Sequence, residues 1–299
     1  MQTKIAFLAH AAILFALLIM PFGYGARADL AEVLKNGELR HLGIRYANFV
    51  TGSGDGLDVE VVKGFAQKLG VRYQLVYTDF DNVLKDLLGK QVVRSGSEVK
   101  LEGEFPVKGE MISTGFTILP WRQKVVDFSA PMFPTQVWLI ARSDSMLNPI
   151  QGSPDLSRDI HETKGLIGGN SLLVMEKTCL DPGLYGLKDK GLDLRKYTKN
   201  TNLNEMVPAL LNKDAELSLL DVADALLDLQ KWTGKIKVIG PVSEIQDMAA
   251  AFPKDSPELR KAFDNYLKEI WDNGQYMILV NKYYPGIVSY FPEFFTARQ

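Results

Sequence analysis

Short apolar segments alternate with amphipathic segments in the first half of the chain, and this rhythm predicts a sheet covered by helices. Residues 39–44 and 71–77 are apolar runs of strand length. Between them, Asp58 can cap a helix that runs to residue 69, because the apolar side chains recur at helical spacing. Residues 80–88 predict a second helix. Strand, helix, strand and helix in this order are typical of an α/β fold with a parallel sheet.

Residues 91–109 interrupt this rhythm. Two valines precede a Ser-Gly-Ser turn, and Val99 and Leu101 then alternate with charged residues. Such a pattern indicates a β-hairpin. We interpret it as an insertion ahead of the strand that leads to residue 115.

The second half of the chain predicts another alternating unit. Residues 142–154 are polar and rich in turn formers, so we expect a domain boundary there. The predicted elements that follow are a strand at 166–167, a helix from Asn170-Ser171 to Glu176, a short strand and a helix within 197–211, a strand at 216–220, a helix at 222–232 and strands at 236–239 and 248–252. A long amphipathic helix at 257–273 ends before Gly274.

The N-terminus has the features of a cleavable signal peptide. Lys4 precedes an apolar run from residue 5 to residue 20, and Ala26-Arg27-Ala28 supplies small residues for cleavage. The alternative, an uncleaved anchor, is disfavoured because prolines and glycines end the run. We therefore expect residues 1–28 to be removed and the protein to be exported to the periplasm.

Composition narrows the class of protein. The whole chain has a net charge of −2, and the chain without residues 1–28 would carry about −4, which argues against nucleic acid and anionic membranes as partners. Cys179 is the single cysteine, so no intrachain disulfide can form, and we expect it to be a small buried hydrophobic residue. Only His41 and His161 follow the leader, and we expect neither a metal site nor a cofactor.

The stretch GFTILPWRQKVVDFSAP at residues 115–131 carries the most specific chemistry. Pro120 forces Leu119 into an extended conformation, so the chain turns between Thr117 and Arg122. A hydroxyl, free backbone groups and a planar guanidinium at the end of a strand can bind a carboxylate. The alternative is that Arg122 forms a salt bridge with a nearby acid.

Other polar and aromatic residues are expected at the same kind of position. In open parallel sheets, ligands bind beyond the carboxyl ends of the strands. The candidate ligand-binding set is Tyr46, Phe49, Phe80, Gly115, Thr117, Arg122, Asn170, Ser171 and Asp221. One cation, one carboxylate, hydroxyls and aromatic rings complement a small zwitterion. Taken singly, Ser171 and Asp221 can instead be helix caps, and Phe80 can be a core residue.

Three segments resemble a known family, the type 2 periplasmic solute-binding proteins of family 3, which serve amino-acid importers. They are GLDVEVVKGFAQKLG at 56–70, GFTILPWRQKVVDFSAPMF at 115–133 and AAFPKDSPELRKAFDNYLKEIWDNGQY at 250–276. The resemblance implies two α/β lobes, each a mixed sheet flanked by helices, with a ligand cleft between them. It implies a first lobe at 29–141, an inserted second lobe at 142–240 and a return to the first lobe at 241–299.

The resemblance also implies roles for individual residues. Gly115, Thr117 and Arg122 match positions that bind the amino and carboxylate groups of the ligand. Ser171 matches the hydroxyl residue of the second lobe, and Asp221 matches the acid that takes the amino group. Phe80 matches the aromatic wall, whereas Leu119 stands where many members have a second threonine.

We therefore expect a non-catalytic, monomeric binding protein that captures an amino acid or small organic acid for a membrane ABC importer. One alternative is a periplasmic dehydratase on the same fold, with Glu176 or Asp221 as the general acid. Another is a ligand-sensing or docking protein that uses the hairpin and the aromatic C-terminal residues. For those aromatic residues, packing against the first lobe is the competing interpretation.

Overall fold

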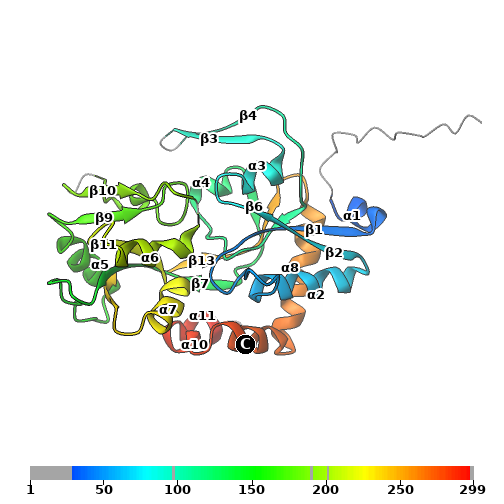
Figure 1. Ribbon diagram of the computed structural model, residues 1–299. Helices are drawn as coiled ribbons and strands as arrows, with labels where there is room; N and C mark the ends of the chain where they lie inside the picture. Colours follow the sequence, from blue (N-terminus) through cyan, green and yellow to red (C-terminus); the bar gives the residue numbers. More distant parts are fainter. Residues whose placement is uncertain (1–28, 96–97, 189–190, 201, 297–299) are drawn as a thin grey trace, which may run out of the picture.

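Two five-stranded mixed sheets with helices around them form the framework of the protein (Figure 1). The computed structural model describes residues 29–95, 98–188, 191–200 and 202–296. The predicted signal peptide lies outside these residues. The α/β class and the two mixed sheets expected from the sequence are confirmed.

The first sheet has the strand order β2-β1-β5-β14-β6. β1 is parallel to β2 and β5, whereas β14 is antiparallel to β5 and β6. Its strands are β1 (Glu38–Ile44), β2 (Arg72–Thr78), β5 (Met111–Ile112), β6 (Val126–Phe128) and β14 (Ala251–Pro253). The helices in this part of the chain are α1 (Leu30–Asn36), α2 (Leu57–Leu69), α3 (Val83–Leu88), α4 (Pro120–Gln123) and α8 (Pro257–Asp272).

The second sheet has the order β10-β9-β11-β8-β12. β9 is parallel to β10 and β11, and β8 is antiparallel to β11 and β12. Its strands are β8 (Val137–Arg142), β9 (Ser171–Val174), β10 (Asp193–Lys196), β11 (Leu217–Asp221) and β12 (Ile236–Pro241). The helices that accompany it are α5 (Leu156–Gly165), α6 (Met206–Leu211), α7 (Val222–Lys231) and the 3-10 turns η1 (Pro182–Tyr185) and η2 (Leu203–Glu205).

The chain passes between the two sheets twice, through β7 (Phe133–Thr135) and β13 (Gln246–Met248). These two strands pair with each other, antiparallel, and Figure 1 shows them between the two sheets. Because β8 already belongs to the second sheet, we now propose that the lobes divide at β7 and β13. The first proposed boundary thus moves ahead of residue 142.

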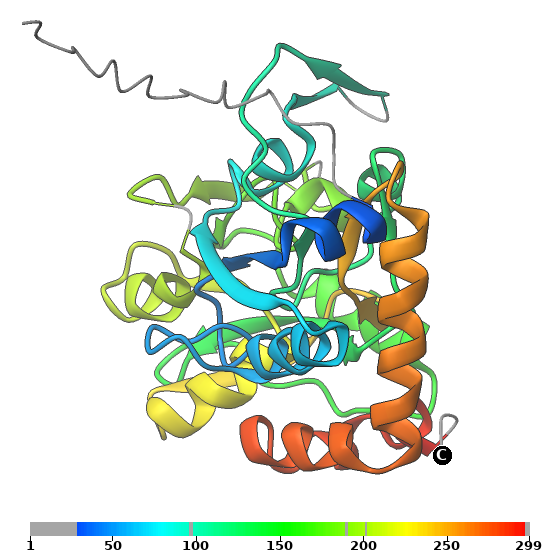
Figure 2. The same cartoon turned by 90° about the vertical axis from the view of Figure 1, so that its right-hand side faces the viewer.

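The inserted hairpin is present as β3 (Gln91–Ser95) and β4 (Glu98–Glu102), which pair antiparallel. It projects from the end of the molecule opposite the C-terminal helices, while α8 runs along one side between those ends (Figure 2).

Two predictions in the second half were wrong. The helix expected from Asn170 is strand β9, and the strand expected at 166–167 is absent, because Leu166 is the C-cap of helix α5. The run Ser171–Val174 is short and apolar, and such a run has no periodicity that separates strand from helix. The strand predicted at 248–252 is divided between β13 and β14.

The aromatic C-terminal residues pack against the body of the protein. They lie on α9 (Gln275–Tyr283), α10 (Ile287–Tyr290) and α11 (Pro292–Thr296) and the turns between them. The ring centroid of Tyr284 is 4.9 Å from that of Phe49 and 4.8 Å from that of Phe133. Tyr290 is 55% exposed, and its ring centroid lies 6.0 Å from that of Trp138 in the second sheet. Among the described residues, no helix is long and apolar enough to span a bilayer.

Candidate functional site

The short helix α4 turns the guanidinium of Arg122 into the protein. Leu119 precedes it in an extended conformation, as Pro120 requires. Arg122 is 2% exposed, its Nη1 donates to the carbonyl of Thr117 at 2.9 Å, and its Cζ lies 3.8 Å from the ring centroid of Phe116. No described acid forms an ion pair with Arg122, and its Nε has no hydrogen-bond partner among these residues. The salt-bridge interpretation of this arginine was therefore wrong for the part of the chain that the structure describes.

Burial gives this cation an unfavourable setting. Desolvation lowers the pKa of Arg122 to about 10, with a smaller contribution from the like charge of Arg94. The side chain is still charged at neutral pH. A buried cation without a counter-ion costs free energy, so an anion bound here would be strongly favoured.

Asp221 provides the opposite charge at the carboxyl end of β11. It is 1% exposed and caps α7, because its Oδ1 accepts from the backbone N–H of Asp224 at 3.2 Å. Its Oδ2 accepts a hydrogen bond from the hydroxyl of Tyr46 and lies 3.7 Å from the Sγ of Cys179. Burial raises the pKa of Asp221 to about 7, partly offset by backbone N–H donors. The residue is thus both a helix cap of the second sheet's α7 and a hydrogen-bond partner of Tyr46, which follows β1 of the first sheet.

Gly115 is held by a residue whose role the sequence did not reveal. Its N–H donates to the Oδ2 of Asp58 at 2.7 Å, and its φ is +61°. A Cβ at this position would lie 2.3 Å from the ring of Phe49. Asp58 does not cap α2, whose N-cap is Gly56. Burial raises the pKa of Asp58 to about 6. The Gly115 N–H therefore already has a hydrogen-bond acceptor within the protein, namely Asp58.

The predicted aromatic residues form one cluster beside these charges. The ring of Tyr46 stacks on that of Phe49 at 5.9 Å and meets Phe80 edge-on at 6.1 Å. Tyr46 and Phe49 are fully buried, whereas Phe80 is partly exposed. The Oγ1 of Thr117 is buried and has no oxygen or nitrogen partner among the described residues.

Asn170 and Ser171 are not brought to this cluster. Ser171 begins β9, where its N–H and hydroxyl bond the carboxylate of Glu216 at 2.8 and 3.2 Å. The amide of Asn170 donates to the carbonyls of Ile167 and Gly168. Since β9 and β11 are parallel, the start of β9 lies at the edge opposite Asp221.

The segment after β9 reaches the cluster instead, and sequence reasoning missed it. Cys179 is 4% exposed, and its carbonyl accepts from the hydroxyl of Tyr185. Burial raises the pKa of the Cys179 thiol, and the charge of Arg122 and the hydroxyl of Thr117 oppose this rise. Had β9 been identified as a strand, its carboxyl end would have pointed to these residues.

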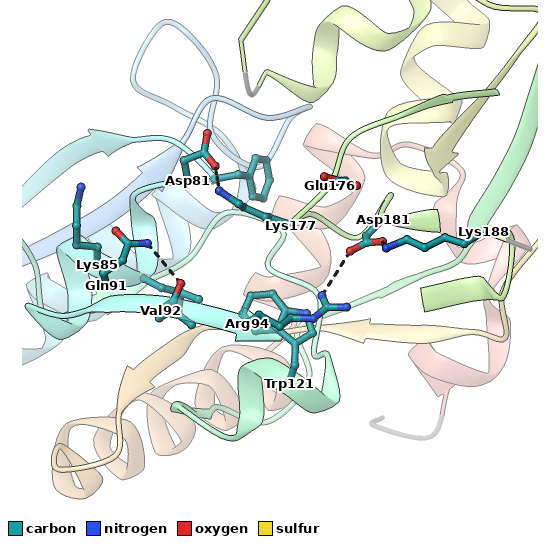
Figure 3. A pocket seen from close by; sticks show the side chains of 12 residues that line it. Asp81, Lys85, Gln91, Val92, Arg94, Trp121, Glu176, Lys177, Asp181 and Lys188 are labelled. Atoms are coloured by element: carbon teal, nitrogen blue, oxygen red, sulfur yellow. Dashed lines mark hydrogen bonds and ion pairs between the residues drawn. The ribbon is translucent and has the colours of Figure 1, made fainter. Parts of the chain in front are cut away.

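A cavity of about 330 Å³ lies next to the cluster (Figure 3). It is bounded by α3, the hairpin and α4 on one side and by residues 176–188 on the other. Phe80 and Trp121 line it, but Arg122 and Asp221 do not. The protein's own side chains therefore fill the space around the buried charges.

Residues 107–286 match the family of bacterial extracellular solute-binding proteins, family 3. The chain belongs to this family. This solute-binding protein is 26% identical over 234 residues to the arginine-binding extracellular protein ArtP of Bacillus subtilis, covering 77% of this chain and 78% of ArtP. It is 20% identical to the octopine-binding periplasmic protein of Rhizobium meliloti, covering 70% and 69% of the two chains.

A further relative is larger than this solute-binding protein. The membrane-bound lytic murein transglycosylase F of Desulfosudis oleivorans is 23% identical over 237 residues, which are 79% of this chain and 45% of the transglycosylase. The chain thus spans about half the length of that relative.

Solved structures share the fold of this solute-binding protein. Holo ArgBP from T. maritima matches with a TM-score of 0.63 and 23% identity over 85% of this chain and 99% of that one. The ancestral amino acid-binding protein AncCDT-1, a precursor of cyclohexadienyl dehydratase, matches with a TM-score of 0.66 and 22% identity over 85% and 99%.

Proposed function

We propose that this solute-binding protein captures an amino acid or a related small organic acid in the periplasm and delivers it to a membrane importer. The observation that carries the proposal is the buried guanidinium of Arg122, which has no acid partner among the described residues. A ligand carboxylate would supply the missing charge. Asp221, on the other side of the cleft, would take an ammonium group.

Binding would be coupled to movement of the two sheets. In this conformation Cys179 and Tyr46 meet at Asp221, so the ligand head group has to displace these contacts. The paired strands β7 and β13 are where the chain passes between the sheets, which makes them the natural hinge. The similarity to arginine-binding and octopine-binding proteins supports a ligand with carboxylate and amino groups.

Isothermal titration of the protein with amino acids and small organic acids tests this function, with Arg122→Met as the informative variant. Two charge-assisted hydrogen bonds at about 1.5–3 kcal/mol each predict an affinity loss of roughly 100-fold or more. The ligand-free variant should unfold at the same or a higher temperature, because a buried unpaired cation is removed. Arg195→Met is the matched control, since Arg195 is half-exposed and paired with Asp193. Unchanged affinity in Arg122→Met would refute the proposal.

An enzymatic role is the second candidate. The pKa of about 7 for the buried Asp221 would let a neutral carboxyl donate a proton near neutral pH, which a dehydratase requires. The similarity to a precursor of cyclohexadienyl dehydratase supports a test of this role. Turnover of cyclic carboxylic acids, abolished by Asp221→Asn, would favour it, and binding without turnover would favour the transport role.

A further inference from the structure

The cavity beside the buried charges has walls of two kinds. Its apolar surface comes from Phe80, Leu84, Val92 and Trp121, on the side of α3, the hairpin and α4. The facing segment contributes only charged residues, from Glu176 to Lys188. In Figure 3, Arg94 of the hairpin extends across the cavity toward Asp181. At about 330 Å³ the cavity lies within the size range of small-molecule sites.

Each carboxylate of the cavity already has a cationic partner. Asp181 pairs with Arg94 at 3.5 Å and with Lys188 at 3.7 Å. Its Oδ1 also accepts the N–H of Gly183 at 2.8 Å. A ligand cation would have to compete with these existing partners.

The other two carboxylates are neutralised in the same way. Glu176 pairs with Lys196 at 2.9 Å, and Asp81 pairs with Lys177 at 3.0 Å. Lys85 also lines the cavity, but no described acid pairs with it. Its Nζ donates to Asn82 and lies 5.4 Å from the ring centroid of Phe105.

A second source of positive charge lies behind one wall. The guanidinium carbons of Arg94 and Arg122 lie 5.5 and 5.3 Å from the ring centroid of Trp121. The indole of Trp121 thus lies near two cations. One is Arg94 of the cavity, and the other is the buried Arg122, which with Asp221, Tyr46, Thr117 and Cys179 forms what we call the head-group cluster. No described acid pairs with Lys85 or Arg122, and the single carboxylate of Asp181 is shared by two cations. Positive charge is therefore in excess around the cavity, which favours binding of an anion.

We propose that this cavity is a second anion subsite of the ligand cleft, in which Arg94 binds a carboxylate at the far end of the ligand. The solute is then an amino acid or organic acid with two acidic groups, whose apolar stem lies along Phe80 and Trp121. This inference rests on the proposed function, because Arg122 holds the first carboxylate. Arg94 is the specificity-determining residue that the inserted hairpin contributes.

Affinities for matched ligands test the inference. Titration calorimetry would compare L-glutamate and L-2-aminoadipate with the neutral L-glutamine and L-norleucine and with the cationic L-ornithine and L-lysine. An acidic ligand is expected to bind at least tenfold more tightly than its neutral counterpart. Equal affinities, or tighter binding of the cationic ligands, would overturn the second subsite while leaving the head-group site intact. Absence of binding by every compound would overturn both proposals.

Variants of the hairpin assign the preference to Arg94. Arg94→Gln should lose at least tenfold in affinity for the acidic ligand and less than twofold for the neutral one. Because this change also leaves the charge of Asp181 less compensated, the double variant Arg94→Gln/Asp181→Asn is needed. Its failure to restore affinity would support a direct contact with Arg94, whereas full restoration would overturn it.

Two further variants complete the experiment. Lys100→Gln is the matched control, because Lys100 lies on the same hairpin, is exposed and does not line the cavity. Lys100→Gln should leave the preference for the acidic ligand unchanged. If it lost as much affinity for the acidic ligand as Arg94→Gln does, the effect of Arg94 would come from the overall positive charge of the hairpin and not from a direct contact. Arg122→Met should weaken all ligands together, which separates the failure of the head-group site from the failure of the second subsite.

Discussion

The head-group cluster around Arg122 and Asp221 and the cavity under the hairpin are adjacent but differ in how they hold charge. In the cluster, Arg122 and Asp221 are 2% and 1% exposed, and Asp221 is bonded to Tyr46. In the cavity, the charged side chains are more exposed, and each carboxylate is paired with a lysine or arginine. The first region is desolvated, whereas most charges of the second reach solvent, although Asp181 is buried.

This difference predicts different consequences of mutation. Burial shifts the pKa of Asp221 and Arg122 substantially, so changes in the cluster should alter both stability and binding. Exposed ion pairs are worth about 0–1 kcal/mol, so changes to the exposed pair Lys177–Asp81 of the cavity should alter selectivity and cleft opening with little effect on folding.

The largest loss of stability is expected from Gly115→Ala. A left-handed backbone costs a residue with a Cβ about 1–2 kcal/mol, and overpacking against the Phe49 ring adds about 1–3 kcal/mol. Urea denaturation should therefore show a loss of about 2–5 kcal/mol. Gly168→Ala is the control, since Gly168 has no positive φ and a Cβ there would meet no other atom within 4 Å. Equal losses in the two variants would contradict this assignment.

A comparable but pH-dependent effect is expected from Asp221→Asn. The pKa of about 7 in the folded protein exceeds the ordinary value of 3.8, so the folded state binds the additional proton between these values. The contribution of Asp221 to stability is therefore complete below pH 4 and is lost as the pH rises through 7. Asparagine is an equally good N-cap and has no charge to bury.

The two proteins should be similarly stable near pH 4, and the variant should be more stable at pH 8 by up to about 4 kcal/mol, because the pKa of Asp221 rises from 3.8 to about 7 and each tenfold change in proton affinity is worth about 1.4 kcal/mol. Urea titrations from pH 4 to pH 8 measure the difference. Asp224 and Asp228 also have raised pKa values through burial, so some pH dependence should persist in the variant. An identical slope in both proteins would mean that Asp221 is ionised in the folded state throughout.

Much of the fold was predictable because its elements are long or bounded by strong signals. The amphipathic repeat of α8, the glycine that ends α2 and the alternation in the hairpin are local properties of the chain. Strand β9 was missed because four apolar residues carry no periodicity. Its misassignment displaced the predicted hydroxyl site to Ser171.

The site was predictable to the extent that it depends on strand ends. Tyr46 and Asp221 meet in the structure, and Cys179 lies 3.7 Å from Asp221 and interacts with the charge of Arg122, which is the kind of arrangement expected at the carboxyl ends of strands. Asp58 could not be identified, because an acid in the first turn of a helix is usually exposed and only the tertiary fold places it against Gly115. Likewise, only the three-dimensional arrangement brings Arg94 of the hairpin to Asp181.

The smallest effect is expected from removing the ion pairs that cross the cavity. Arg94–Asp181 and Lys177–Asp81 join the hairpin side to the segment after β9. Cys179 is 4% exposed and is the single cysteine, so its reaction with a thiol reagent should report opening of the cleft. The double variant Arg94→Gln/Lys177→Gln should react about fivefold faster, because two pairs of about 0.5 kcal/mol each contribute about 1 kcal/mol together.

Lys68→Gln is the control for this measurement, since its pair with Glu269 joins α2 and α8 without crossing the cleft. High salt should accelerate labelling of the wild-type protein and leave the double variant nearly unchanged, because it screens the same two pairs. If Lys68→Gln reacted as fast as the double variant, the cysteine would be reporting general unfolding. If neither variant nor salt altered the rate, closure would be held by the buried contacts of Tyr46, Cys179 and Asp221, and the exposed charges would act on ligand selection alone.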